Sequence, residues 1–258
     1  MATSSSTEFI VPDWPTPPGV GCLVTTRRGG VSQGAYSSLN LGDHVGDDPK
    51  AVAANRDIVS RNVGAQPVWL NQVHGTRVVD AAEHRRDDVP PEADAACTRR
   101  TGVACTVMTA DCLPVLLCDD SGTVVAAAHA GWRGLLAGVL EDTVTAMGVP
   151  GTSLMAWLGP AIGPQAFEVG DEVRAAFAAA APETAQAFQS VAGGKWLADI
   201  YLLARLRLKG RGVERVFGGN RCTVTEEDRF FSYRRDGQTG RMASMIWLTT
   251  GEVSASPV

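Results

Sequence analysis

The sequence predicts a single α/β domain in which a mixed central β-sheet is flanked by helices. The chain has 258 residues, of which 45% are hydrophobic and 20% charged, a composition that excludes a disordered or fibrous protein. Short runs rich in valine and leucine alternate with longer segments of helical periodicity, as expected when strands are buried beneath helices. Neither an internal repeat nor a convincing linker divides the chain.

Local patterns predict the elements in order. Asp48 followed by Pro49 is typical of a helix start, an N-cap before a proline at the first helical position, and the helix should run to about residue 62. Strands are expected where short apolar runs are bounded by turn residues, at 20–26, 68–73, 76–81, 103–108, 113–118, 123–128, 154–158, 213–217 and 242–249. Further helices are expected at 134–147, 172–180, 183–189 and 196–209.

The domain boundaries follow from the same reading. We expect residues 1–18 to form a flexible N-terminal segment, 19–250 the single catalytic domain and 251–258 a C-terminal tail. The first residues have neither the basic nor the apolar region of a secretory signal, and no apolar run is long enough to cross a membrane. The sequence therefore predicts a cytoplasmic protein.

Charge and cysteine content narrow the function classes. The formal net charge is −5, which argues against a protein that follows the phosphates of a nucleic acid. Six cysteines in a large chain without a signal favour buried thiols or metal ligands over disulfides. Only four histidines are present, too few for the several copper centres of a multicopper oxidase.

Polar residues interrupt the buried pattern at the ends of three expected strands, where a rigid scaffold presents reactive side chains. His74, Cys112 and His129 in these segments form a His₂Cys set, which suits zinc or copper. Three protein ligands leave a tetrahedral zinc ion one open position, the pattern of a catalytic site. The long intervals between the three residues are unlike those of a zinc finger and fit ligands gathered from separate strands.

Two other interpretations of these residues stay open. Cys112 could be a buried hydrophobic side chain, with both histidines satisfied by ordinary hydrogen bonds. Alternatively, Cys112 and a histidine could act without metal as nucleophile and base.

Other polar residues are candidates for substrate contacts. Arg27 precedes a Gly-Gly turn and Arg133 stands at a helix start, and either guanidinium could bind an anion such as phosphate. His44 could act as an acid or base near neutral pH, and Asn40 and Asn71 could contact a sugar. Asp111 is a candidate for orienting a metal ligand, although an adjacent strand residue points the other way.

Longer stretches are similar to a known bacterial family. The segments NQVHG, TADCLPVLL, AAHAGWRG, LGPAIGPQAFEVG and FFSYRRDGQTGRMASMIWL, with the opening TTRRGGVSQGAYSSLNLGDHVGDDP, resemble the YfiH-like family over roughly residues 19–249. This family has been called laccase-domain protein, polyphenol oxidase, purine nucleoside phosphorylase and peptidoglycan editing factor.

The resemblance implies a fold, a metal site and several activities. The fold would be the YfiH-like α/β layered sandwich, which is related to cysteine hydrolases typified by a bacterial deamidating toxin. The family's metal ligands fall on His74, Cys112 and His129. The family is associated with phosphate-dependent cleavage of adenosine, inosine and methylthioadenosine, with adenosine deamination, with removal of misincorporated L-Ser from a cell-wall precursor, and with copper-dependent phenol oxidation.

These implications give one leading hypothesis and three alternatives. The leading hypothesis is a zinc-dependent purine nucleoside enzyme, with a purine nucleoside and phosphate as its partners. The alternatives are an amide hydrolase acting on a muropeptide precursor, a single-copper oxidoreductase, and a non-catalytic binding protein with a vestigial site. We expect a monomer or small homo-oligomer that binds neither nucleic acid nor membrane.

Overall fold

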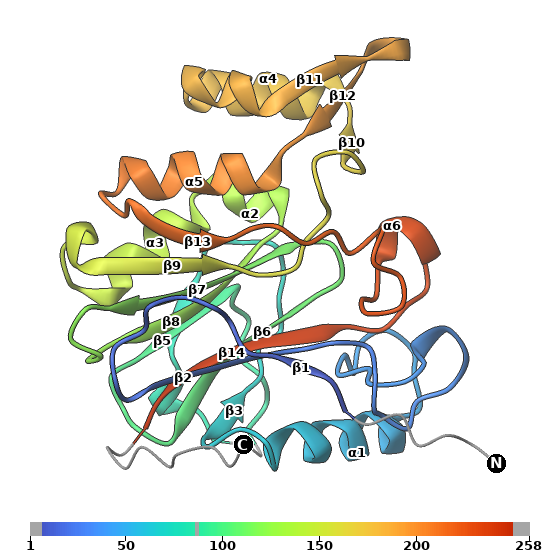
Figure 1. The fold of residues 1–258 in the computed structure, drawn as a ribbon, viewed down its shortest axis with the longest axis vertical. Coiled ribbons are helices and arrows are strands. Elements are labelled where there is room, and N and C mark those ends of the chain that lie inside the picture. The colour runs from blue at the N-terminus through green and yellow to red at the C-terminus, as the bar shows by residue number, and fades with distance from the viewer. Residues whose placement is uncertain (1–6, 86–87, 250–258) are drawn as a thin grey trace.

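The computed structural model describes residues 7–85 and 88–249. Two mixed β-sheets pack face to face, and helices cover both outer faces, so the molecule has four layers (Figure 1). The predicted α/β class with mixed central sheets is thereby confirmed. None of the helices in these ranges is both long and apolar enough to cross a bilayer.

The strands of the two central sheets come from both halves of the chain. One sheet has the order β1 (Phe9–Ile10), β2 (Val20–Thr25), β14 (Met242–Leu248), β6 (Val103–Thr109) and β3 (Gln66–Val68). The other has the order β13 (Arg215–Gly218), β9 (Leu154–Leu158), β7 (Leu113–Asp119), β8 (Val125–Ala130), β5 (Ala95–Thr98) and β4 (Val78–Asp80). Only the β3–β6, β4–β5 and β9–β13 pairs of these two sheets are parallel.

Helices bury the outer faces of both sheets. The five-stranded sheet packs on α1 (Pro49–Ser60), which begins as predicted, with the Asp48 side chain accepting a hydrogen bond from the Lys50 amide. The six-stranded sheet is covered by α2 (Trp132–Ala137), α3 (Val139–Met147) and α5 (Ile200–Gly210). Beyond α5 lie α4 (Asp171–Ala180) and a small sheet in the order β10 (Glu168–Val169), β12 (Lys195–Ala198), β11 (Phe188–Val191) (Figure 1).

Strand β7 shows why the middle of the chain is apolar throughout. Leu113, Val115 and Leu117 point to the helices, whereas Leu116 and Cys118 point to the other sheet. A strand with helices on one face and a sheet on the other has no solvated side, so alternation of apolar and polar residues disappears.

The structure corrects several predicted boundaries. The strand expected at 68–73 is β3, which ends at Val68, and residues 69–77 form a loop. The strand expected at 76–81 is β4, which covers only Val78–Asp80. The helix expected at 134–147 is divided into α2 and α3 at Gly138, whose φ of 108° is left-handed and cannot continue a right-handed helix.

The Ala-rich region after α4 is also different from the prediction. Residues 182–187 form a 3₁₀ helix, and β11 and β12 then pair as a hairpin before α5 begins at Ile200. Phe188 and Trp196 in these strands are aromatic residues that favour a pleated surface. The short elements β5, β10 and α6 (Tyr233–Asp236) were not predicted.

The packed part of the chain begins before residue 19. Within the segment expected to be flexible, Phe9 and Ile10 pair with β2, and Trp14 is 8% exposed. The expected C-terminal tail at 251–258 lies outside the described residues, as do residues 1–6.

Candidate metal centre and its pocket

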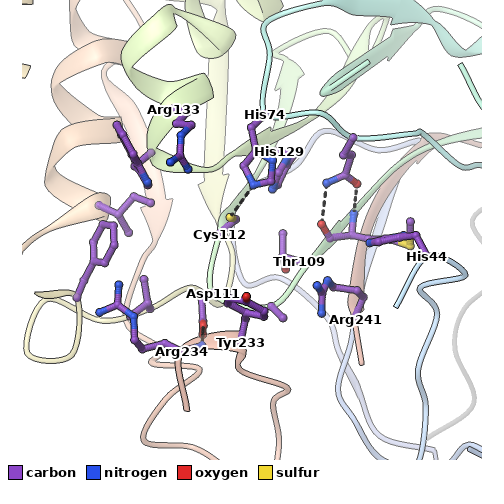
Figure 2. Close-up of a pocket in the computed structure, with 17 residues that line it drawn as sticks. His44, His74, Thr109, Asp111, Cys112, His129, Arg133, Tyr233, Arg234 and Arg241 are labelled. Carbon is purple, nitrogen blue, oxygen red and sulfur yellow. Dashed lines mark hydrogen bonds between the residues drawn. The ribbon is translucent and has the colours of Figure 1, made fainter. Parts of the chain in front are cut away.

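His74, Cys112 and His129 meet at one end of the six-stranded sheet (Figure 2). Cys112 Sγ lies 3.7 Å from His74 Nε2, and the centroids of the two imidazole rings are 4.8 Å apart. The three candidate ligand atoms all lie within 4.8 Å of one another, in the one such group found among residues 7–85 and 88–249. A thiolate with two imidazoles is a donor set that suits zinc or copper.

Strand register brings two of these residues together. In the antiparallel β7–β8 pair, Leu113 is opposite Ala130 and Pro114 is opposite His129. Cys112 directly precedes Leu113 and therefore lies beside the end of β8. His129 is only 3% exposed, so its ring is held on all sides by the fold.

His74 comes from the loop between β3 and β4, and the buried carboxylate of Asp94 holds that loop in place. Asp94 accepts hydrogen bonds from the backbone amides of Val73, His74 and Gly75 at 3.2, 2.9 and 2.7 Å. Its Oδ1 also lies 2.8 Å from His129 Nδ1. One fully buried carboxylate thus fixes the backbone beside one candidate ligand and the ring of another.

The electrostatics of the cluster favour its charged forms. Burial acts to raise the pKa of Asp94, but the hydrogen bond and charge of His129 and the loop amides outweigh it, so this pKa is lowered. Burial likewise acts to raise the pKa of Cys112, and the two histidines lower it. The pKa of His129 is raised, because the charge of Cys112 and the hydrogen bond to Asp94 outweigh burial.

The surroundings of the cluster fit a metal ion. Asp94 at Nδ1 of His129 leaves Nε2 to face Cys112, as carboxylates do behind metal-binding imidazoles. Gly131 closes the other side: a Cβ atom there would lie 2.8 Å from His74 Cδ2 and 3.0 Å from Cys112 Sγ. The absence of a side chain at this position leaves room for both candidate ligands.

The cluster lies in the wall of a cavity of about 450 Å³. Three arginines, several aromatic and aliphatic side chains and a few polar groups line it: His44, Gln72, His74, Met108, Thr109, Ala110, Asp111, Cys112, His129, Trp132, Arg133, Ile162, Phe167, Ile200, Tyr233, Arg234 and Arg241 (Figure 2). The volume and the mixture of apolar and cationic lining are typical of a site for a small organic molecule with an anionic partner.

The cavity gathers five of the predicted site residues. His74, Cys112 and His129 form the cluster, Arg133 projects from α2, and His44 projects from the loop before α1 with its side chain 56% exposed.

Arg27 is elsewhere. Its Nε donates to the Ser37 carbonyl and its Nη1 to the Glu227 carbonyl, and its guanidinium lies 4.7 Å from the centroid of the Phe231 ring. It lines a different surface depression, beside Asp228 and Asp236. The turn that follows β2 is thus tied to residues 227–231, and the expectation that Arg27 binds substrate in this cavity is corrected.

The two predicted asparagine contacts are also absent from the cavity lining. Asn40 is fully buried, with Oδ1 accepting from the amides of Gly42 and Arg241 and Nδ2 donating to Gly42 and Asp47. Asn71 makes a backbone bridge to Glu92, and the next residue, Gln72, lines the cavity instead.

Asp111 lines the cavity but does not orient a candidate ligand. Its carboxylate accepts from Thr223 Oγ1 and from the Arg234 amide, both at 2.6 Å, and so fixes the start of α6. It is Asp94 that orients His129, and the sequence patterns did not single out this residue. A signal was present, because Asp94 is a lone acidic residue in the run Ala93-Asp94-Ala95-Ala96.

Comparisons with known proteins show the family of this chain. The sequence profile of a family described as multi-copper polyphenol oxidoreductase laccase matches residues 21–249. The chain belongs to this family. It is 57% identical over 241 residues to a Pseudomonas aeruginosa protein named purine nucleoside phosphorylase, covering 93% of this chain and 98% of that relative. It is 55% identical to Escherichia coli purine nucleoside phosphorylase YfiH, covering 93% and 99%.

Solved structures of similar proteins confirm the fold. A crystal structure of a Neisseria meningitidis protein matches with a TM-score of 0.91 at 60% identity, covering 93% of this chain and 99% of that chain. YlmD from Geobacillus stearothermophilus matches with a TM-score of 0.86 at 31% identity, covering 95% and 99%. The predicted resemblance to the YfiH-like family is therefore confirmed.

Proposed function

We propose that this protein is a zinc-dependent purine nucleoside enzyme, which cleaves adenosine, inosine and methylthioadenosine with phosphate and deaminates adenosine. The observation that carries the proposal is that one cavity combines the His/Cys/His cluster with aromatic rings and three guanidinium groups. Relatives at 55–57% identity that are named purine nucleoside phosphorylase support it.

The apolar lining suits a purine base. Phe167 and Trp132 are mostly covered, whereas the ring of Tyr233 is 63% exposed at the edge of the cavity. A purine presents two flat apolar faces, which stack on aromatic side chains, and a polar rim, which needs hydrogen bonds. Tyr233 therefore provides an exposed ring against which the base could be held.

The cationic lining suits phosphate. Arg133, Arg234 and Arg241 line the cavity, and no carboxylate lies within ion-pair distance of them in the described part of the chain. Guanidinium groups bind phosphate oxygens through paired hydrogen bonds. Phosphorolysis joins a phosphate oxygen to C1′ while the C1′–N9 bond breaks, and its electron pair leaves with the base. His44, which lines the cavity, would give the departing base a proton.

His74, Cys112 and His129 would hold the metal ion, with Asp94 orienting His129. When bound, zinc in this donor set supplies Lewis acidity and lowers the pKa of water at its open position toward about 7. Such chemistry suits deamination, in which water adds at C6 of adenosine and ammonia leaves. We propose zinc over copper because metal selection in cells follows supply as well as affinity.

The test is a product analysis with a matched pair of variants. Purified protein is incubated with adenosine, with and without phosphate, and adenine, ribose 1-phosphate and inosine are measured together with bound metal. Wild type and Cys97→Ala, which alters a thiol remote from the cavity, should contain about one zinc per chain and form both products. Cys112→Ala should lose most of its zinc and both activities. Absence of both products in zinc-loaded wild type would refute the proposal.

A second function is favoured by one further observation. Cys112, His129 and Asp94 form a thiol–imidazole–carboxylate series, the arrangement of cysteine hydrolases, in which the imidazole takes the thiol proton. The metal-free protein could thus hydrolyse an amide, such as that of a misincorporated L-Ser in a muropeptide precursor. Because a thiolate bound to metal cannot attack, a chelator should raise this amidase activity and abolish deamination. Loss of amidase activity on chelation would exclude Cys112 as the nucleophile.

A copper oxidase of several metal centres is not supported. The chain has four histidines in all, and the described residues provide one group of metal-binding side chains. A single Cu(II) ion bound to Cys112 should colour the protein through strong visible absorption, and a preparation in which metal analysis finds zinc and no copper would exclude copper. The free thiols at all six cysteines support our proposal that the protein works in the reducing cytoplasm.

A further inference from the structure

Arg241 is more buried than the other two arginines of the cavity and is carried by a different part of the fold. Arg133 on α2 and Arg234 on α6 are exposed, whereas Arg241, which directly precedes β14, is partly buried. In Figure 2, Arg241 enters from the opposite side of the cavity to Arg133 and Arg234. The two exposed arginines lie where they can attract anions, and Arg241 lies where an anion would be held.

The backbone and guanidinium of Arg241 are fixed before any ligand binds. Its amide donates to Asn40 Oδ1 at 2.9 Å, and its carbonyl accepts from the Leu41 amide at 3.2 Å. Its Nη1 donates to the carbonyls of Thr239 and Gly240, both at 3.0 Å. Buried Asn40, expected from the sequence to touch substrate, instead positions Arg241.

The rest of the guanidinium has no partner. Nε and Nη2 of Arg241 make no hydrogen bond within residues 7–85 and 88–249, and no carboxylate there lies within 4.0 Å. Two other partly buried arginines have carboxylate partners, Arg56 with Asp43 at 3.2 Å and Arg229 with Glu8 at 2.7 Å, and a third, Arg205, donates from both Nη atoms to carbonyls. Burial lowers the pKa of Arg241, which shows that its charge is partly desolvated. A partly buried cation without a counter-ion favours a ligand that supplies the opposite charge.

A hydroxyl group lines the same cavity as this cation. In the β6–β14 pair, Thr109 is opposite Met242, the residue after Arg241. Thr109 is 3% exposed, lines the cavity, and its Oγ1 has no hydrogen-bond partner among the described residues. Thr109 lies three residues before Cys112 in the sequence, and both line the cavity. An anion held here would therefore be close to the His/Cys/His cluster.

We propose that Arg241 and Thr109 form the phosphate subsite of this cavity, with Nε and Nη2 of the guanidinium and the threonine hydroxyl donating to the phosphate oxygens. This inference rests on the proposed nucleoside phosphorolysis for its ligand. It replaces the expectation that Arg27 binds the phosphate. Arg133 and Arg234 would then attract the anion at the entrance of the cavity without holding it.

The test separates phosphate from nucleoside. For zinc-loaded wild type, Arg241→Gln, Arg241→Lys, Thr109→Val and the surface control Arg61→Gln, we would measure KM for phosphate, KM for adenosine, and the rate of deamination. Arg241→Gln should raise KM for phosphate roughly 10- to 100-fold, the effect of losing a charged, paired hydrogen bond. Arg241→Lys should recover part of this loss, and Thr109→Val should raise it roughly 3- to 10-fold. KM for adenosine, deamination and the Arg61→Gln variant should stay within about threefold of wild type.

Binding of inorganic phosphate, followed by calorimetry, keeps this inference separate from the proposed function. If wild type binds phosphate and Arg241→Gln does not, the subsite stands even if no nucleoside is cleaved. The inference is overturned if Arg241→Gln, shown to be folded by its circular dichroism and melting temperature, keeps wild-type affinity for phosphate. It is also overturned if Arg133→Gln weakens phosphate binding as much as Arg241→Gln does. Should Arg241→Gln fail to fold, the near-isosteric Thr109→Val decides: unchanged phosphate affinity there overturns the subsite.

Discussion

The two halves of the candidate metal centre, His74 on one side and Cys112 with His129 on the other, are held by different kinds of structure. Cys112 and His129 are placed by the register of two buried antiparallel strands. His74 is exposed, has a φ of 62°, and depends on a loop whose amides bind Asp94. Strand pairing fixes a side chain by many backbone hydrogen bonds at once, whereas the loop is held by a few side-chain contacts: its amides bind Asp94, and Gln72 binds the backbone of Met108. Changes at Cys112 and His129 should therefore lower the stability of the fold, whereas changes at His74 should mainly weaken metal binding.

Removal of each histidine gives the largest contrast. His129→Ala leaves the buried Asp94 carboxylate without its imidazole partner, and we expect the metal-free protein to lose about 3–5 kcal/mol of unfolding free energy. His74→Ala removes an exposed ring but keeps the backbone hydrogen bond to Asp94, and should change stability by less than about 1 kcal/mol. Both variants should lose most of their zinc. Urea denaturation of chelator-treated proteins measures the difference, and equal destabilisation by the two variants would contradict it.

Replacement of the carboxylate that joins the halves comes next. Asp94→Asn keeps the size of the side chain, but an amide cannot accept from three loop amides and an imidazole together. We expect a loss of about 2–3 kcal/mol in stability and a 10- to 100-fold weaker affinity for zinc. Competition with a fluorescent zinc chelator measures the affinity. Zinc affinity equal to that of wild type would show that Asp94 does not position the ligands.

A methyl group at Gly131 tests the contact between the halves. The Cβ atom of Gly131→Ala would press on His74 and Cys112 at 2.8 and 3.0 Å. The backbone φ there is −62°, so only the close approach opposes the change. Because the loop yields more easily than the strands, His74 should move away, with a loss of about 1–2 kcal/mol in stability. Zinc should bind more weakly, while the control Gly210→Ala at the end of α5, where a Cβ atom would meet no atom within 4 Å, should leave zinc binding unchanged. Undiminished zinc binding in Gly131→Ala would argue against this geometry.

The smallest effect is the pH dependence that Asp94 adds. Since the pKa of Asp94 is lowered in the folded state, its contribution to stability is present above the unfolded aspartate pKa of about 3.9 and is lost as pH falls through the folded value. The stability difference between wild type and Asp94→Asn should therefore be constant between about pH 5 and pH 6, below the range in which His129 titrates, and shrink in more acidic solution. Unfolding free energies of the metal-free proteins between pH 3 and 7 test this. A difference that grows on acidification would reverse the sign and the assignment.

Several features could be predicted because their causes are local. The buried strands at 103–109 and 113–119, the capped start of α1 at Asp48 and the ligand-type residues at strand ends all follow from short-range patterns. Other elements were missed where the local pattern was weak. Strand β5 reads Ala-Ala-Cys-Thr, without the β-branched run that indicates a strand, and it is a strand because β8 and β4 lie on either side of it.

The sequence by itself determined the fold class, the family and the three candidate metal ligands, because apolar periodicity and residue type are properties of the chain alone. Only the tertiary structure decided which polar residues share the cavity. Asp94 reaches His129, and Asn40 reaches Arg241, through contacts between residues far apart in sequence. The same long-range packing tied Arg27 to residues 227–231 and left part of the Arg241 guanidinium without a partner in the described chain. A side chain's hydrogen-bond partners depend on the register and packing of distant strands, which no short stretch of sequence encodes.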